Sequence, residues 1–120
     1  MKLLLDTNFI IDCVRFKIDL HDGVCKLEEN EGKIELFIPF YCIEELKAVR
    51  NVNAKIALEL LKRVRIIDIE KTASTDLSLL DYAKEHEYAV ATNDRGLLER
   101  LEKNGVKAVR IRQRKYFEVC

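Results

Sequence analysis

The chain has 120 residues, 48% of them hydrophobic, which is enough for one domain with a hydrophobic core. Basic and acidic side chains balance at 21 each, and this excludes a uniformly basic surface that would coat nucleic acid. No apolar run approaches the roughly 20 residues of a membrane-spanning helix. The apolar run after Met1 is cut short by Asp6, so it is typical of a buried strand and not of a signal peptide. We therefore expect a single cytoplasmic domain, residues 1–120, with no contact to a membrane.

Strand-like and helix-like segments alternate along the chain. Short apolar runs predict strands at 2–5, 34–38, 65–69, 88–91 and 106–111, with a sixth at 116–119. Helical periodicity and capping residues predict helices at 9–14, 20–29, 41–50 and 54–63, one that opens at 74–76, and one at 95–103. This alternation predicts an α/β fold of three layers, α/β/α, around a mostly parallel central sheet of about five strands.

An acidic side chain follows each of the first four predicted strands. Asp6 directly follows the first, Asp76 opens the helix after the third, and Asp94 follows the fourth by two residues. The pair Glu44-Glu45 lies in the helix after the second strand. Because ligands bind outside the carboxyl ends of the strands in such sheets, we expect these carboxylates to converge.

Two interpretations of these acids remain open. Any single aspartate near a helix start is explained by helix capping. Several converging carboxylates repel one another, however, and the usual remedy is a hard cation such as Mg²⁺ or Mn²⁺. Such an ion suits phosphodiester hydrolysis, because it activates water and neutralises charge on the phosphate. Helix geometry also separates the two glutamates: Glu45 flanks the apolar stripe of its helix, whereas Glu44 lies nearly opposite that stripe.

Four short motifs carry these acids. They are Leu5-Asp6-Thr7-Asn8, Ile38-Pro39 followed by Glu45-Leu46, Asp76 with Ala83 seven residues later, and Thr92-Asn93-Asp94-Arg95. In order and placement they resemble the PIN-domain family, over Leu3 to about Lys115. The match is closest to the archaeal subgroup similar to the eukaryotic PIN nucleases that process ribosomal RNA. One departure is that Leu77 stands where that subgroup often has a second aspartate.

The resemblance implies a metal-dependent ribonuclease. Its catalytic residues, which bind one or two Mg²⁺ or Mn²⁺ ions directly or through water, would be Asp6, Glu45, Asp76 and Asp94. Water would attack the RNA phosphodiester in line and leave a 5′-phosphate and a 3′-hydroxyl. Hydrogen bonds from three neighbouring polar residues are expected to orient the ligands or the backbone. These residues are Asn8, Thr92 and Asn93.

Basic residues gather near the end of the chain. Between Val106 and Tyr116 there are five of them and no acidic one. One interpretation is an edge strand that charge protects from aggregation, and the other is a surface that contacts phosphate. On a strand, Arg110, Arg112 and Arg114 would share one face. The candidates for RNA binding are Arg95, Arg112 and Arg114.

Several functions stay open at this level. The nuclease could serve ribosomal RNA processing or RNA quality control, or it could be a toxin of the VapC type in a toxin–antitoxin pair. Its partners would accordingly be single-stranded or structured RNA, and a ribosome-assembly factor or an antitoxin. Homodimers are common in the family, although no stretch singles out an interface. A non-catalytic scaffold that binds RNA or protein is the third alternative. A dehalogenase-like phosphatase ranks lower, because it needs an aspartate where Asn8 stands.

Overall fold

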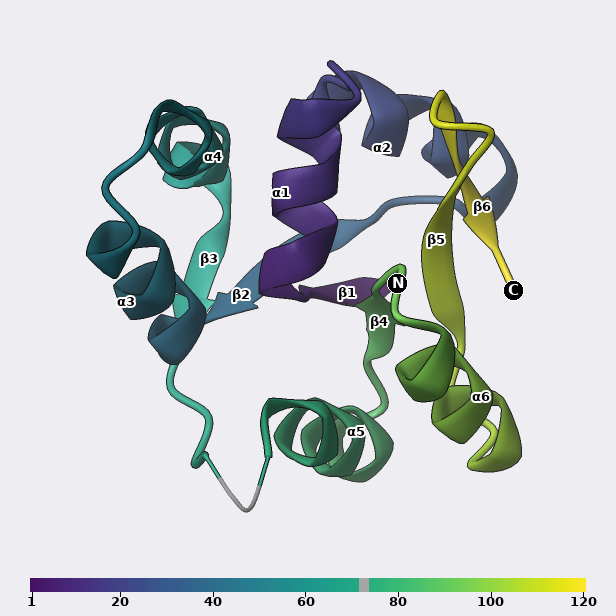
Figure 1. Ribbon diagram of the computed structural model, residues 1–120. Coiled ribbons are helices and arrows are strands. Elements are labelled where there is room, and N and C mark those ends of the chain that lie inside the picture. The colour runs from purple at the N-terminus through teal and green to yellow at the C-terminus, as the bar shows by residue number, and fades with distance from the viewer. Residues whose placement is uncertain (72–73) are drawn as a thin grey trace.

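The computed structural model describes residues 1–71 and 74–120, and within them six strands form one sheet (Figure 1). The strands are β1 (Lys2–Leu5), β2 (Glu35–Pro39), β3 (Arg65–Ile67), β4 (Ala89–Ala91), β5 (Ala108–Arg112) and β6 (Tyr116–Val119). Their order across the sheet is β3-β2-β1-β4-β5-β6. Neighbours are parallel except β5 and β6, which are antiparallel. The predicted α/β fold with a mostly parallel sheet is therefore confirmed, with the sixth strand included.

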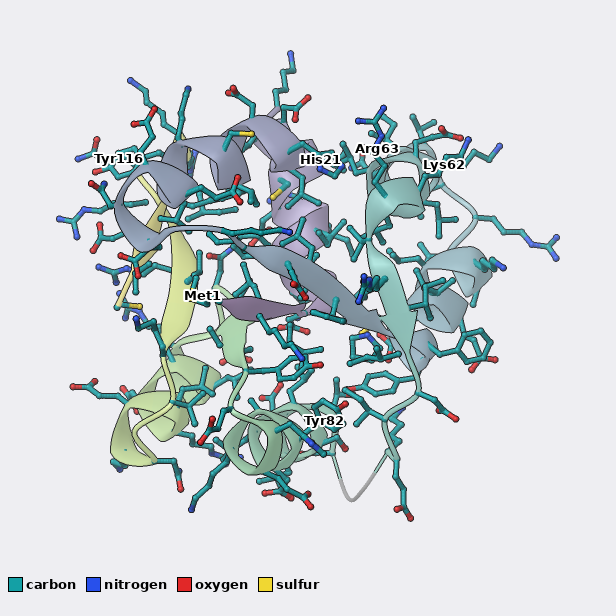
Figure 2. All side chains as sticks on the ribbon, turned by 180° about the vertical axis from the view of Figure 1, so that it is seen from behind. Met1, His21, Lys62, Arg63, Tyr82 and Tyr116 are labelled. Atoms are coloured by element: carbon teal, nitrogen blue, oxygen red, sulfur yellow. The ribbon has the colours of Figure 1, made fainter. Side chains whose placement is uncertain are left out.

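Helices cover both faces of this sheet. They are α1 (Thr7–Arg15), α2 (Leu20–Glu31), α3 (Phe40–Ala48), α4 (Val52–Leu60) with a 3₁₀ turn at Leu61–Arg63, α5 (Thr75–His86) and α6 (Arg95–Lys103). Side chains alternate along β1: Leu3 and Leu5 join the core under α1 to α4, and Leu4 joins the core under α5 and α6. Figure 1 shows the two groups of helices on opposite sides of the sheet, and Figure 2 shows the reverse side, with Met1 before β1 and Tyr82 on α5. No helix in the described ranges is both long and apolar enough to cross a membrane.

Capping residues at both ends of the last helix, α6, predict its bounds correctly. The Asp94 side chain caps α6, which ends at Lys103, and Gly105 follows two residues later with a φ of 69°. The N–H of Val106 donates to the carbonyl of Leu101, and the N–H of Gly105 donates to that of Glu102. This pair of bonds is a Schellman motif, in which glycine adopts the left-handed conformation without a steric penalty. The helix therefore has the predicted bounds.

The helix α3 is shorter than predicted. It ends at Ala48, and Val49 leaves the helical region with φ −86° and ψ 99°. Val49 is 48% exposed, and the predicted continuation of the helix to residue 50 was wrong. Similarly, β3 ends at Ile67 and not at Ile69. These differences lie at element ends, where local pattern is weakest.

The basic strand β5 is not an edge strand, because β6 pairs with it along its outer side. The interpretation as a charge-protected edge was therefore wrong. A turn joins the two strands, and its residues Gln113 and Arg114 have φ values of 53° and 56°. A turn with two left-handed residues matches the twist of paired antiparallel strands. Arg114 therefore lies in the turn and does not share a strand face with Arg110 and Arg112.

Close packing holds this hairpin against α2. The ring of Phe117 on β6 packs against Phe9, with ring centroids 5.0 Å apart, and Phe117 is only 7% exposed. A Cβ atom added to Gly23 would lie 2.5 Å from Phe117 Cε2. Glycine at position 23 thus lets α2 approach the hairpin.

Replacing Gly23 tests this contact. We expect Gly23→Ala to lower the free energy of unfolding by about 1–3 kcal/mol, because the packed ring has no room to move. Asn30→Ala, on the exposed side of α2, is the control, and helix propensity should raise its stability by a few tenths of a kcal/mol. Urea unfolding measures both. A Gly23→Ala protein as stable as the control would contradict the packing argument.

Candidate functional site

Asp6 lies where β1 ends, one residue before α1. Its backbone N–H donates to the carbonyl of Ala91 at 3.1 Å, so it also lies beside the end of β4. The residue is only 3% exposed. It occupies the N-cap position of α1, but among the described residues its side chain makes no capping hydrogen bond. Instead its Oδ2 accepts from Thr92 Oγ1 at 2.9 Å. The helix-capping interpretation therefore fails for Asp6.

Electrostatics connect Asp6 to two other acids. The pKa of Asp6 is raised to about 6, chiefly by burial and also by the charges of Asp76 and Asp94, against the lowering effect of hydrogen bonds from the Thr92 hydroxyl and the Thr7 backbone. Burial also raises the pKa of Asp76, and the charge of Asp94 adds to the rise. Carboxylates affect one another in this way only when they face a common region. Asp6 and Asp94 follow the adjacent strands β1 and β4, and Asp76 lies near enough for its charge to raise the pKa of Asp6.

Helix capping explains Asp94 but not Asp76. The cap of α5 is Ser74, whose Oγ accepts from the N–H of Leu77 at 3.1 Å. Asp94 Oδ1 accepts from the N–H groups of Gly96 and Leu97 at 2.8 and 3.2 Å. Both bonds use Oδ1, so the cap does not require Oδ2.

Glu45 is turned toward the end of β1. Its Oε2 accepts from Thr7 Oγ1 at 3.3 Å, and its Oε1 lies 4.0 Å from Lys71 Nζ. Because Thr7 directly follows Asp6, this bond brings α3 beside the other acids. Glu44 is exposed, in agreement with the orientation that helix geometry predicts for the pair.

The three polar residues expected to support the acids differ in what they contact. Thr92 is fully buried, and besides its bond to Asp6 it accepts from the N–H of Asp94 at 3.2 Å. Asn93 donates to Asp12 Oδ2 and accepts from the N–H of Ile111, both at 2.8 Å. It therefore ties α1 to β5 and does not touch the four acids. Asn8 is exposed and lines the same hollow as Asp94.

The three arginines proposed for RNA contact lie on three different segments. Arg95 is exposed at the start of α6. Arg112, at the end of β5, already forms an ion pair with Glu118 at 3.3 Å. Arg114 lies in the β5–β6 turn, 5.4 Å from the centroid of the Phe16 ring. Glu118 thus neutralises part of the basic stretch.

The structure adds Tyr41 to the site, which the sequence analysis did not. Its hydroxyl is buried and has no hydrogen bond within residues 1–71 and 74–120. Burial raises the pKa of Tyr41, and the neighbouring Cys42 and the carboxylates of Asp6, Glu45 and Asp76 raise it further. Tyr41 stands four residues before Glu45, and this helical spacing was the signal that could have found it.

Lys71 was also missed. Its Nζ lies 5.7 Å from the centroid of the Tyr41 ring and close to Glu45. Lys71 lies in the connection after β3, where no periodicity predicts which way a side chain points. Thr7 belongs to the motif Leu5-Asp6-Thr7-Asn8, but the sequence did not predict its hydrogen bond to Glu45.

The donor chemistry of these acids fits a hard divalent cation. Carboxylate oxygens are the ligands that Mg²⁺ and Mn²⁺ prefer, and a cation would relieve the repulsion that raises the pKa of Asp6 and Asp76. In the described part of the chain, no three His, Cys, Asp or Glu side chains lie close enough together to hold a metal ion. The acids therefore share a region without forming a closed set of ligands.

The buried charge of Asp6 makes a prediction for the metal-free protein. The pKa of about 6 lies above the ordinary value of 3.8, so the unfolded chain loses this proton first and ionisation lowers stability as the pH rises between these values. We expect Asp6→Asn to raise the free energy of unfolding by about 2 kcal/mol at about pH 7.5 in EDTA, and the gain to vanish near about pH 4.

Urea unfolding over this pH range measures the effect. Asp81→Asn removes an exposed carboxylate from α5 and is the control, with little change expected. A destabilised Asp6→Asn protein at neutral pH would contradict the proposed penalty of burial.

Comparison with known proteins agrees with this geometry. The family described as PIN like domain matches residues 3–114. Ribonuclease VapC4 of Methanocaldococcus jannaschii is 30% identical over 126 aligned positions, which cover 98% of this chain and 95% of that protein. The structure of the PIN domain endonuclease Utp24 superposes with a TM-score of 0.82 at 28% identity, over 98% of this chain and 90% of that chain. This chain belongs to the PIN-like domain family.

Proposed function

We propose that this protein is a metal-dependent endoribonuclease that acts in ribosomal RNA processing or RNA quality control. Its site would consist of Asp6, Glu45, Asp76 and Asp94. The observation that carries the proposal is the Asp6 carboxylate, which is buried, does not cap its helix and lies near two other acids. Such a group lowers stability, and proteins keep destabilising groups where function uses them.

The residues of this chain would divide the work as follows. The four acids would hold Mg²⁺ or Mn²⁺, directly or through water, and such an ion would supply charge neutralisation at the phosphate and a lowered pKa of water. Thr92 fixes Asp6 Oδ2 and the Asp94 backbone at once, and Thr7 fixes Glu45. Hydrogen bonds of this kind orient ligands before the substrate arrives. In-line attack on RNA would then leave a 5′-phosphate and a 3′-hydroxyl.

The names of the relatives support RNA as the substrate. One is a ribonuclease and the other an endonuclease of the same domain type. The identity of 30% to Ribonuclease VapC4 favours a second candidate, a toxin of the VapC type with an antitoxin as partner. The gene neighbourhood discriminates between the two, because a short reading frame overlapping this one would favour the toxin.

An RNA cleavage assay tests the proposal. End-labelled single-stranded and hairpin RNA would be incubated with the protein in Mn²⁺, in Mg²⁺ and in EDTA. We expect cleavage only with metal, and a loss of about 10²-fold or more in Asp6→Asn and Asp94→Asn, because each removes a ligand charge. Asp81→Asn, which changes an exposed acid on α5, should cleave like the wild type.

The products and the controls decide the outcome. Products with 5′-phosphate ends agree with the proposed hydrolysis, whereas 2′,3′-cyclic phosphates would contradict it. Cleavage that survives EDTA, or that persists unchanged in both site variants, would point to a contaminating nuclease. The non-catalytic scaffold would then become the better interpretation.

A further inference from the structure

A basic and aromatic surface lies at the far end of α1 from the acids. The helix starts beside Asp6 and ends at Arg15, so its two ends are about 13 Å apart at 1.5 Å per residue. At the far end a hollow of about 380 Å³ lies between α2, the segment after α1 and the β5–β6 turn. We call it the basic hollow, and its side chains include Phe16, Lys17, Lys26, Arg114, Lys115 and Tyr116.

Cations outnumber acids in the basic hollow. Lys26 is neutralised by Asp22, at 3.3 Å, and Asp19 caps α2 by accepting from the N–H of Asp22. The other three cations form no ion pair with any described residue, and they are Lys17, Arg114 and Lys115. Since the whole chain carries no net charge, this surplus is local.

The backbone holds two of these cations in unusual conformations. Four non-glycine residues have a positive φ in the described ranges, and three of them lie in the segments that border the hollow: Lys17 at 57°, Gln113 at 53° and Arg114 at 56°. Left-handed backbone is unfavourable for residues with a Cβ, and such residues gather at functional sites. These backbone conformations thus fix the direction in which the side chains of Lys17 and Arg114 leave the backbone.

Aromatic rings accompany the cations. The Phe16 ring has Arg114 Cζ at 5.4 Å and Arg15 Cζ at 5.9 Å from its centroid. Tyr116 is 42% exposed at the start of β6, at the outer corner of the molecule in Figure 2. Cations that meet phosphates, beside aromatic rings on which bases stack, are typical of surfaces that bind single-stranded nucleic acid.

A second hollow lies along α1 and reaches from Arg15, next to Phe16 of the basic hollow, to Asp94, one of the four acids. It has a volume of about 340 Å³ and lies between α1 and the start of α6, lined by Asn8, Ile11, Asp12, Arg15, Asn93 and Asp94. The four residues from α1 follow the spacing of a single helix face, so the hollow runs along the helix. Figure 1 shows α1 rising from the centre of the view to its upper part, where α2 and the β5–β6 turn also lie.

We propose that the basic hollow binds a single-stranded segment of RNA, which continues along the exposed face of α1 to the acids. The proposal rests on the proposed function for its substrate class. It assigns phosphate contacts to Lys17, Arg114 and Lys115 and base stacking to Tyr116. Arg112 is not assigned a contact, because it is paired with Glu118, which also pairs with Arg110.

The test measures binding without cleavage. The Kd of a fluorescent oligouridine of about ten nucleotides would be determined in EDTA from about 50 to about 200 mM salt. One variant combines Lys17→Gly, Arg114→Gly and Lys115→Ala, with glycine at the two positions of positive φ so that the backbone stays unstrained. A matched control removes three exposed cations from other surfaces, by Lys33→Ala, Lys55→Ala and Lys103→Ala.

The two kinds of contact give different signatures. We expect the hollow variant to bind about 30-fold more weakly at low salt. The slope of log Kd against log salt should fall by about 2, because a variant that makes fewer phosphate contacts releases fewer counterions on binding. Tyr116→Ala should weaken binding about 10-fold and leave the slope unchanged, because stacking carries no charge. The control should stay within about 3-fold of the wild type.

Each outcome bears on the proposal separately from catalysis. Equal affinity of the hollow variant and the control would overturn it, whether or not the protein cleaves RNA. Polyglutamate of similar length that binds as tightly, with no effect of Tyr116→Ala, would also overturn it and indicate an acidic protein partner. The expected binding losses in a protein that cleaves nothing would support the hollow and contradict only the proposed function.

Discussion

The hydrogen bond between Thr92 and Asp6 is the interaction on which the arrangement of the site depends. It joins the ends of β1 and β4, which are adjacent in the sheet although 86 residues separate them in the chain. The order of strands reverses direction at this point, where parallel sheets leave a crevice. A carboxylate there is removed from water, and hydrogen bonds from the Thr92 hydroxyl and the Thr7 backbone compensate only part of that loss. The fold thus places an unfavourable buried charge at the point where the strand order reverses.

The same connection organises the surroundings. Thr92 holds the backbone of Asp94 as well as the side chain of Asp6, while the next residue, Asn93, ties α1 to β5 through Asp12 and Ile111. Three consecutive polar residues therefore serve three different purposes. One positions a buried acid, one fixes the neighbouring helix and one caps α6. Adjacent residues of one sequence motif therefore have different structural roles, because each contacts a different part of the fold.

Much of this could be predicted from sequence, because the signals were local. The bounds of α6 follow from an aspartate cap and a terminal glycine, and the neighbouring positions of Asp6 and Asp94 follow from their place after strands that are adjacent in the sheet. The orientation of Glu45 follows from helix periodicity alone. What could not be predicted depends on pairing between distant segments. The placement of β6 outside β5 decides that Glu118 neutralises Arg112, and the connection after β3 decides that Lys71 reaches Glu45. The alternating basic residues likewise did not predict the turn at Gln113 and Arg114, which places Arg114 outside the strand.

The distance along the chain between Asp6 and Thr92 also bears on how the protein forms. Closing a loop of this length carries an entropic cost, and contacts between such distant residues generally form late in folding. During synthesis, β1 and β2 can pair as soon as residue 39 has emerged, whereas β4 must wait for about fifty residues more. A chain that has emerged beyond residue 45 therefore already contains Asp6 and Glu45 but cannot bring Asp94 to them. The acidic site can therefore assemble only when the domain is nearly complete. In a chain truncated before β4, Asp6 and Glu45 would be present without Asp94.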